Sequence, residues 1–296
     1  MASAAEVAAM RRAIALSAAG LGATSPNPPV GCVLLDSGDE VVGEGFHERK
    51  GEPHAEAQAV AAASNQAAGS TAVVTLEPCN HHGRTPPCRQ TLIDAGVRRV
   101  VIALMDPTSR GDGGAVELRR AGVEVETGVL AAEARTVLGG WLDAFGTRRP
   151  AITWPYVVAE HAVASLPAGN AEERRLRLNA DAVLEADGAV REAVAGSHGK
   201  GILVLNDLGV DADAQEATAQ LYHGGVRRLL LVGGLEVARP FLDLKLIDRV
   251  LAYLPSGSPS RPGPRGLPWY LLPPGFAITA TDRIDGFTRV EGTPTR

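Results

Sequence analysis

The sequence predicts an α/β protein of two domains, the first a three-layer structure with a largely parallel sheet between helices. A length of 296 residues is typical of two domains rather than one. Strand-like apolar runs alternate with helix-like segments through the first half, which favours a parallel sheet with helices on both faces. The segment 146–150 (GTRRP) has the composition of a linker, so we expect domains at residues 1–146 and 150–296.

The elements of the first domain can be placed in order along the chain. We expect the Ala-rich run up to Gly20 to be an amphipathic helix, because charged residues interrupt it. A hairpin follows, and then a helix opened by Pro53, whose missing N–H costs nothing in a first turn. The expected bounds are Pro29–Asp36, Glu40–Phe46, Pro53–Ala68, Ala72–Leu76, Pro87–Ala95, Arg98–Leu104, Gly114–Ala121, Val123–Glu126 and Glu133–Phe145.

The second half gives weaker signals. Its expected strands are Ala151–Val158, Ala180–Leu184, Ile202–Leu205 and Arg228–Val232. The segment Pro255–Pro274 contains seven prolines, so we expect it to be a loop or an excursion from the sheet edge.

Composition excludes several classes of function. A formal net charge of -5 argues against nucleic-acid binding, which normally leaves a basic footprint. The N-terminal run has neither the pattern of a secretory signal nor the length to span a bilayer. Three cysteines, an odd and small number, argue against a disulfide framework. We therefore expect a cytoplasmic protein with no membrane partner.

A divided set of metal-ligand residues is the main functional signal. His54-Ala55-Glu56 begins a predicted helix, and Pro78-Cys79 and Pro87-Cys88 follow about two dozen residues later. One imidazole and two thiolates can bind a tetrahedral zinc and leave its fourth position open for water. Glu56 would lie within reach of that water and could move its proton, as in the hydrolytic removal of an amino group from a nucleobase ring.

Other interpretations of these residues stay open at this point. A lone histidine is usually a core or capping residue, and a free cysteine is often a small buried hydrophobe. A structural zinc would need a fourth protein ligand, which His81 or His82 could supply, but it would leave Glu56 without a purpose. Cys32 lies in an apolar strand without a partner motif, so we expect it in the core.

The spacing of the two cysteines resembles one family in particular. The run Thr75–Cys88 (TLEPCNHHGRTPPC) resembles the deaminase half of the RibD (RibG) family, cytidine-deaminase-like enzymes of the riboflavin pathway. The segments Thr24–Gly31 (TSPNPPVG), Pro53–Glu56 and Asp106-Pro107 fit the same family, and the likeness covers about residues 8–146. It implies zinc-dependent deamination of a diaminohydroxypyrimidine that carries a phosphoribosylamino group.

The resemblance also implies roles for single residues. It implies one zinc ion per chain, bound by His54, Cys79 and Cys88, with Glu56 as the proton shuttle. Thr108 departs from the family, which usually has Asn after Asp-Pro, and this puts one polar contact in doubt. The implied substrate-binding residues are Asn27, His47 and His81 at the base or ribose, Arg84 and Thr85 at the phosphate, and Asp106.

The second half resembles a truncated dihydrofolate-reductase-like α/β domain, the family's NADPH-dependent reductase. Several positions depart from that family. Pro155 replaces a lysine, 160–163 (EHAV) replaces Ser-Leu-Asp-Gly, 186–190 (ADGAV) replaces Gly-Thr-Gly-Thr-Val, and Val232 replaces an acidic residue. A carboxylate in place of hydroxyl donors is unfavourable for an anionic dinucleotide. We expect a degenerate domain that binds no NADPH and serves packing or assembly.

Three alternatives follow from the same resemblance. The chain could be a bifunctional deaminase and NADPH-dependent reductase with an altered cofactor site. It could serve a specialised pathway that uses the same pyrimidine intermediate. The second domain could be purely a dimerisation module, in keeping with the homo-oligomer that we expect.

Overall fold

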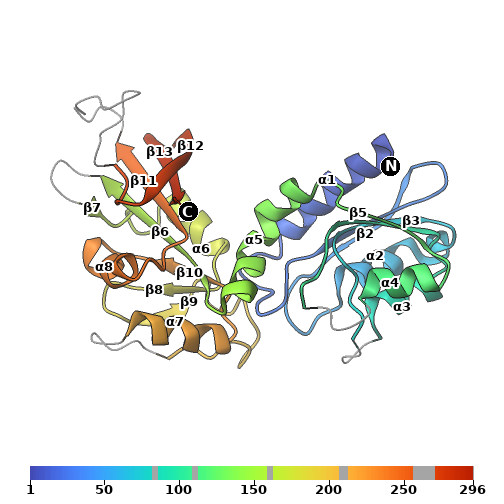
Figure 1. Cartoon of the computed structure of the whole chain (residues 1–296), viewed down its shortest axis with the longest axis horizontal. Helices are drawn as coiled ribbons and strands as arrows, with labels where there is room; N and C mark the ends of the chain where they lie inside the picture. The colour runs from blue at the N-terminus through green and yellow to red at the C-terminus, as the bar shows by residue number, and fades with distance from the viewer. Residues whose placement is uncertain (82–85, 109–112, 159–162, 207–212, 256–270, 296) are drawn as a thin grey trace. The chain divides into compact units, whose positions relative to one another are not determined.

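The computed structural model describes residues 1–81, 86–108, 113–158, 163–206, 213–255 and 271–295. The chain forms two compact units, Met1–Leu142 and Asp143–Arg296 (Figure 1). The helix α5 (Ala131–Thr147) runs past this division and includes the first two residues of the predicted linker. Among the described residues, no helix is long and apolar enough to cross a membrane.

The sheet of the first unit has the strand order β2-β1-β3-β4-β5. The strand β1 pairs antiparallel with β2 and β3, whereas β3, β4 and β5 are parallel to one another. This confirms the predicted hairpin followed by a parallel sheet. The strands are β1 (Gly31–Leu35), β2 (Val41–Phe46), β3 (Thr71–Leu76), β4 (Arg99–Leu104) and β5 (Glu124–Thr127).

The helices of this unit lie close to their predicted positions. A capping box between Ser3 and Glu6 starts the first helix. The second begins at Ala55 rather than at Pro53, with His54 as an N-cap residue in extended conformation, and it ends in the 3-10 turn η1 (Ser64–Ala67). The helices are α1 (Ala4–Ala18), α2 (Ala55–Ala63), α3 (Cys88–Asp94) and α4 (Gly114–Arg120).

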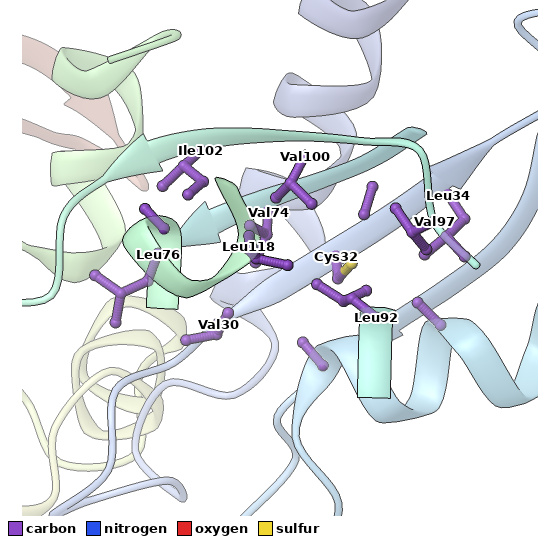
Figure 2. Close-up of a cluster of buried hydrophobic side chains, with 14 of the residues drawn as sticks. Val30, Cys32, Leu34, Val74, Leu76, Leu92, Val97, Val100, Ile102 and Leu118 are labelled. Carbon is purple, nitrogen blue, oxygen red and sulfur yellow. The ribbon is translucent and has the colours of Figure 1, made fainter. Parts of the chain in front are cut away.

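The two faces of this sheet bury different residues of each strand, so the unit has three layers. In β1, Cys32 and Leu34 belong to the cluster with α2, α3 and α4, whereas Val33 and Leu35 belong to the cluster with α1. Figure 2 shows Cys32 and Leu34 among the side chains of the first cluster. Full burial of each such side chain contributes about 1.5–3 kcal/mol. Cys32 is a core residue, as predicted.

The sheet of the second unit has the strand order β12-β13-β11-β6-β10-β8-β9, with β7 paired to β6. Its central strands β11, β6, β10 and β8 are parallel, and antiparallel strands flank them. The strands are β6 (Ala151–Val158), β7 (Val163–Ala164), β8 (Ala182–Leu184), β9 (Val190–Glu192), β10 (Arg228–Leu231), β11 (Arg249–Pro255), β12 (Phe276–Ile284) and β13 (Phe287–Pro294).

Helices cover both faces of this second sheet. Residues of α7 (Ala214–His223) and α8 (Leu235–Asp243) pack into one apolar cluster, which contains Trp154 and Tyr156 of β6. Leu176 of α6 (Ala171–Leu178) packs into the other cluster with Leu251 and Tyr253 of β11. The second unit is therefore also a layered α/β structure.

This unit differs from the sequence prediction at one predicted strand and at several strands that were not predicted, among them β11. Ile202–Leu205 is not a strand but an irregular segment, whose Val204 N–H donates to Gly224 O at the end of α7 (2.8 Å). A four-residue apolar run does not distinguish a strand from a segment that packs against a helix. The β12–β13 hairpin was not predicted, and most residues of β12 are exposed, so the apolar pattern of a half-buried strand is absent. Most of the predicted proline-rich loop, 256–270, lies outside the described residues.

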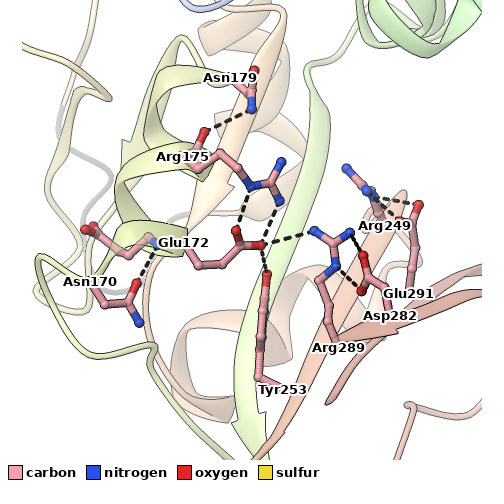
Figure 3. Close-up of polar contacts among 10 residues, drawn as sticks. Asn170, Glu172, Arg175, Asn179, Arg249, Tyr253, Asp282, Arg289 and Glu291 are labelled. Atoms are coloured by element: carbon pink, nitrogen blue, oxygen red, sulfur yellow. Dashed lines mark hydrogen bonds and ion pairs between the residues drawn. The ribbon is translucent and has the colours of Figure 1, made fainter. Parts of the chain in front are cut away.

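A buried carboxylate ties α6 to the sheet of the second unit. Glu172 is 4% exposed and accepts hydrogen bonds from Arg175 (2.6 and 2.7 Å), Tyr253 Oη (2.6 Å) and Arg289 (3.1 Å), as Figure 3 shows. Arg289 also pairs with Asp282 of β12 (2.5 Å). Despite burial, which opposes ionisation, these donors and charges lower the pKa of Glu172 to about 2.

We predict that Glu172→Gln destabilises the protein at neutral pH by roughly 1–3 kcal/mol, because buried donors lose a charged acceptor. The folded-state pKa is about 2, below the ordinary 4.5, so this stabilisation exists above pH 4.5 and disappears as pH falls towards 2. Urea unfolding of the full chain at several pH values measures the difference. The exposed Glu216→Gln is the matched control. An equal difference at pH 7 and at pH 2 would contradict the assignment.

Candidate metal centre and active site

Three segments of the first unit bring the predicted zinc ligands together. His54 is the N-cap residue of α2, Cys79 lies three residues after the end of β3, and Cys88 is the first residue of α3. The side chain of His54 makes no capping hydrogen bond, so its ring is free to face the thiols. The Arg89 N–H donates to Cys79 O (3.3 Å) and holds the two cysteine segments together.

The ligand atoms have the spacing that a tetrahedral metal requires. His54 Nδ1 lies 3.2 Å from Cys88 Sγ and 3.8 Å from Cys79 Sγ. All three ligand atoms lie within 4.8 Å of one another. Zinc bonds of about 2.0–2.3 Å at tetrahedral angles place neighbouring nitrogen and sulfur ligands roughly 3.6 Å apart. The observed distances bracket that value, so the residues fit zinc.

The polar contacts of this group favour a thiolate at Cys79. The Cys88 thiol, the His54 ring and the Cys88 N–H (3.2 Å) all stabilise a negative charge on Cys79 Sγ, and they lower the pKa of Cys79 to about 4. The hydrogen bond to Cys79 in turn raises the pKa of His54. A thiolate is the form of cysteine that binds metals.

Glu56 lies beside the ligands at the first turn of α2. Its carboxyl group is in hydrogen-bond contact with the Cys88 thiol, and the residue is 3% exposed. Burial, followed by the nearby negative charge of Cys79, raises the pKa of Glu56 to about 7. The structure therefore places the predicted proton shuttle next to the predicted metal ligands.

Asn27 and His47 form a polar pair beside His54. Asn27 Nδ2 lies 3.2 Å from His47 Nε2, and His47 Nδ1 lies 3.2 Å from the Pro53 carbonyl oxygen. The His47 and His54 rings are 5.0 Å apart in an edge arrangement. Burial lowers the pKa of His47 to about 4, so the ring is neutral at pH 7. Its Nδ1–H then donates to Pro53, and Nε2 accepts from Asn27.

The loop that carries Asn27 is closed by an internal hydrogen bond and held by one contact from α5. The Asn27 N–H donates to Thr24 O (2.9 Å), and Trp141 Nε1–H of α5 donates to Pro26 O (3.0 Å). The Ser25–Pro26 peptide bond is cis. The TSPN segment is thus fixed against the same unit that holds the metal ligands.

Of the remaining predicted site residues, the structure describes only His81 and Asp106. His81 is exposed and does not belong to the group of metal-ligating atoms found among the described residues. Asp106 Oδ1 accepts both the N–H and the hydroxyl of Thr108 (2.7 Å each), so Thr108 serves the turn. Arg84 and Thr85, predicted to hold a phosphate, and His82, the other candidate fourth ligand, lie outside the described residues.

Sequence reasoning did not identify Glu77, the residue between β3 and Pro78-Cys79. It is 5% exposed, and its carboxylate accepts the N–H groups of Asp106 (3.2 Å) and Ala115 (2.9 Å). The sequence does contain one signal for this residue. Glu77 directly follows an apolar strand, and a charged side chain buried at such a place needs hydrogen-bond partners.

Comparisons with known proteins agree with this geometry. Residues 4–104 match the family described as the cytidine and deoxycytidylate deaminase zinc-binding region. The riboflavin biosynthesis protein RibD of Escherichia coli is 49% identical over 144 residues, 48% of this chain and 39% of that protein. The diaminohydroxyphosphoribosylamino-pyrimidine deaminase of Buchnera aphidicola (from Schizaphis graminum) is 44% identical over 142 residues, 48% of this chain and 96% of that protein.

The chain belongs to the RibD family. Its match to the E. coli RibD spans 39% of that protein's length. Solved structures of the family extend the likeness to both units. A deaminase/reductase from Thermotoga maritima has a TM-score of 0.79 at 26% identity, over 98% of this chain and 99% of that one. The RibD of Acinetobacter baumannii has a TM-score of 0.75 at 26% identity, over 99% of both chains. The expected fold class is confirmed.

We predict that Cys79→Ser loses most of the bound zinc, because a serine oxygen does not supply the soft thiolate that zinc prefers. Elemental analysis of the purified variant measures zinc per chain. The matched control is Cys32→Ala, which removes a cysteine from the core and should retain the metal. Full zinc in Cys79→Ser, or an equal loss in both variants, would contradict the assignment.

Proposed function

We propose that the first unit of this RibD-family chain hydrolytically deaminates a diaminohydroxypyrimidine that carries a phosphoribosylamino group, a step of riboflavin biosynthesis. The observation that carries the proposal is the convergence of His54, Cys79 and Cys88 with the Glu56 carboxyl beside them. The names of the matched relatives support this choice of substrate, since the Buchnera relative is a deaminase of this pyrimidine and is covered almost completely.

In this proposal His54, Cys79 and Cys88 hold one zinc ion per chain. Zinc, when bound, supplies a Lewis acid that makes a nucleophile available from water near neutral pH. Neutral imidazole and two thiolates suit that role, because three protein ligands leave a position open. Of the two candidate fourth ligands for a structural zinc, His81 does not join the group among the described residues, and His82 lies outside them. The catalytic role is favoured by the buried Glu56 beside the ligands.

Glu56 performs the proton transfers of this reaction. It accepts the proton of the attacking water and delivers protons to the ring nitrogen and the departing amine. A bond forms from the water oxygen to the ring carbon, the bond from that carbon to the amine breaks, and ammonia leaves. Burial beside Cys88 keeps the carboxyl at the place where these protons move.

The polar pair beside the ligands is suited to recognise the substrate. His47 is neutral with a fixed tautomer, and Asn27 bonded to it presents an amide, so both can hydrogen-bond an uncharged base or ribose. We assign His81 and Asp106 to the same surface, and Arg84 and Thr85 to the phosphate, by the family resemblance. A guanidinium and a hydroxyl are suitable partners for a phosphate.

We also propose that the protein acts in the cytoplasm as a homo-oligomer. Its three cysteines are free, and free thiols are typical of a reducing compartment. The oligomeric state stays a prediction.

The second unit, we propose, does not reduce the sugar with NADPH. Carboxylates accept backbone N–H groups at two turns of this unit, and one of them, 186–190, is the segment that the resemblance assigns to the cofactor. Asp187 accepts the Ala189 N–H (3.0 Å) and pairs with Arg191 (3.3 Å) in the turn between β8 and β9. At the start of α8, Glu236 accepts the Gly234 N–H (2.8 Å). Helix N-termini after a strand bind phosphate through such N–H groups.

A bifunctional deaminase and reductase is the second candidate function. The whole-chain likeness to the Thermotoga maritima protein, which is named as both, favours it. Pro155 on β6 weighs against it, because proline offers neither a cation nor a backbone donor to a cofactor. The two candidates differ in what they predict for NADPH.

We predict that Glu56→Gln retains the fold and the zinc but loses deamination by roughly 10²–10⁴-fold, because an amide cannot carry the proton. Ammonia release from the pyrimidine substrate and elemental analysis of the same preparation measure both quantities. Glu133→Gln, an exposed glutamate of the same unit, is the control. Ammonia release within a few-fold of wild type would show that Glu56 is not the shuttle.

We predict no saturable NADPH binding below about 1 mM, because Asp187 replaces a donor in the segment that the resemblance assigns to the cofactor and Pro155 replaces a lysine. Calorimetric titration of the full chain, and NADPH oxidation with the deaminated pyrimidine present, provide the measurement. Micromolar binding of NADPH accompanied by its oxidation would instead show that the protein is a bifunctional deaminase and reductase.

A further inference from the structure

Glu77 joins three segments of the first unit through one buried carboxylate. Its backbone N–H donates to Leu104 O (2.8 Å), which extends the parallel pairing of β3 with β4. One carboxylate oxygen accepts the Asp106 N–H (3.2 Å), and the other accepts the Ala115 N–H (2.9 Å). A buried anion with two backbone donors is strongly held, since such charge-assisted bonds are about twice as strong as neutral ones.

The helix α4 is attached to this residue rather than capped by its own sequence. Its N-cap residue, Gly113, has no side chain to accept the first N–H groups. Glu77, which lies in another segment, accepts the Ala115 N–H instead. A negative charge at a helix N-terminus is favourable because of the helix dipole. The seven-residue helix therefore depends on Glu77 for its first turn.

Two glycines allow α4 to approach so closely. A Cβ at Gly113 would lie 2.4 Å from Glu77 Oε1, and one at Gly114 would lie 1.7 Å from Pro78 O. Non-bonded atoms do not approach to such distances. At Gly114 the obstacle is backbone, so only glycine permits this contact, whereas at Gly113 a Cβ would displace the Glu77 carboxylate. The first turn of α4 thus rests directly on the two residues that precede Cys79.

We propose that Glu77 is a positioning residue of the deaminase site, which fixes the Cys79 ligand and the Asp106–Thr108 segment relative to each other. Cys79 is two residues away, and Pro78 between them has a restricted backbone. Any tilt of the Glu77-Pro78 segment therefore moves the Cys79 sulfur relative to His54 and Cys88. This inference rests on the proposed function, although its metal-geometry part can be measured without any substrate.

The test uses Glu77→Gln in the full chain, loaded with cobalt in place of zinc. Glutamine keeps the size of the side chain, but its NH₂ group opposes one backbone N–H, so one of the two contacts is lost. We expect a changed visible spectrum of the cobalt–thiolate centre. We also expect kcat to fall roughly 10- to 100-fold with a smaller change in KM, because misplaced reacting groups affect the chemical step. Glu133→Gln, on the exposed surface, should change neither quantity.

Two further variants keep the inference falsifiable if Glu77→Gln folds poorly. Glu77→Asp retains the charge and should recover part of the kcat. Gly114→Ala keeps Glu77 but displaces α4 from Pro78, so it should alter the cobalt spectrum in the same direction. Wild-type spectra and wild-type kcat in folded Glu77→Gln and Gly114→Ala proteins would overturn the proposal, and stability loss alone would show a purely structural role. Absence of deamination in the wild-type protein would instead refute the proposed function, while the cobalt spectra would still decide the role of Glu77.

Discussion

The contact of His54 Nδ1 with the sulfur atoms of Cys79 and Cys88 joins segments that are 25 and 34 residues apart in the sequence. Bringing these atoms within a few ångströms requires the N-termini of two helices to meet the C-terminal end of one strand. In the strand order β2-β1-β3-β4-β5, the strand β3, which precedes Cys79, is central. The helices α2 and α3 both pack on the same face of this sheet, so their first residues can meet the end of β3. The small residues of α2 and the glycines of β2 allow that close packing. A Cβ at Gly45 would lie 2.5 Å from Ala55 O.

The site combines buried thiols and a buried carboxyl, whose ionised forms a bound cation would stabilise. Cys79 is held as a thiolate, and Cys88 and Glu56 are buried in contact with each other. Buried anions are costly unless they are paired or coordinate a metal. The neighbouring His47 contributes no compensating charge, since burial keeps it neutral. A divalent ion bound to the imidazole and thiolates would stabilise both thiolates, and it would also favour the ionised form of Glu56.

Much of the first unit could be predicted from the sequence, because its strands β1 and β3 are buried along their whole length and the His-Ala-Glu and Pro-Cys motifs carry chemistry in their spacing. The prediction that Pro53 opens α2 was wrong by two residues, since His54 is an extended N-cap residue turned towards the thiols. The role of Glu77 could not be predicted, because its partners are backbone N–H groups of residues 106 and 115, which no side-chain pattern reveals.

The second unit was harder to predict for related physical reasons. Its β12–β13 hairpin is largely exposed and lacks a buried apolar face, whereas the apolar Ile202–Leu205 run is irregular and packs against the end of α7. The hydrogen bond from the Gly234 N–H to the Glu236 carboxylate at the start of α8 could not be predicted from the sequence. Together with Asp187, this carboxylate gives the proposed absence of cofactor binding a local electrostatic basis, independent of the overall likeness to the Thermotoga maritima deaminase/reductase.

The most direct test of the account is the mass of the product formed from the pyrimidine substrate in heavy-oxygen water with NADPH present. The account predicts a product in which one amino group is replaced by an oxygen from water, with the sugar unchanged and NADPH not consumed. A substrate recovered intact would contradict the proposed deamination. A product with a reduced, opened sugar would contradict the assignment of the second unit.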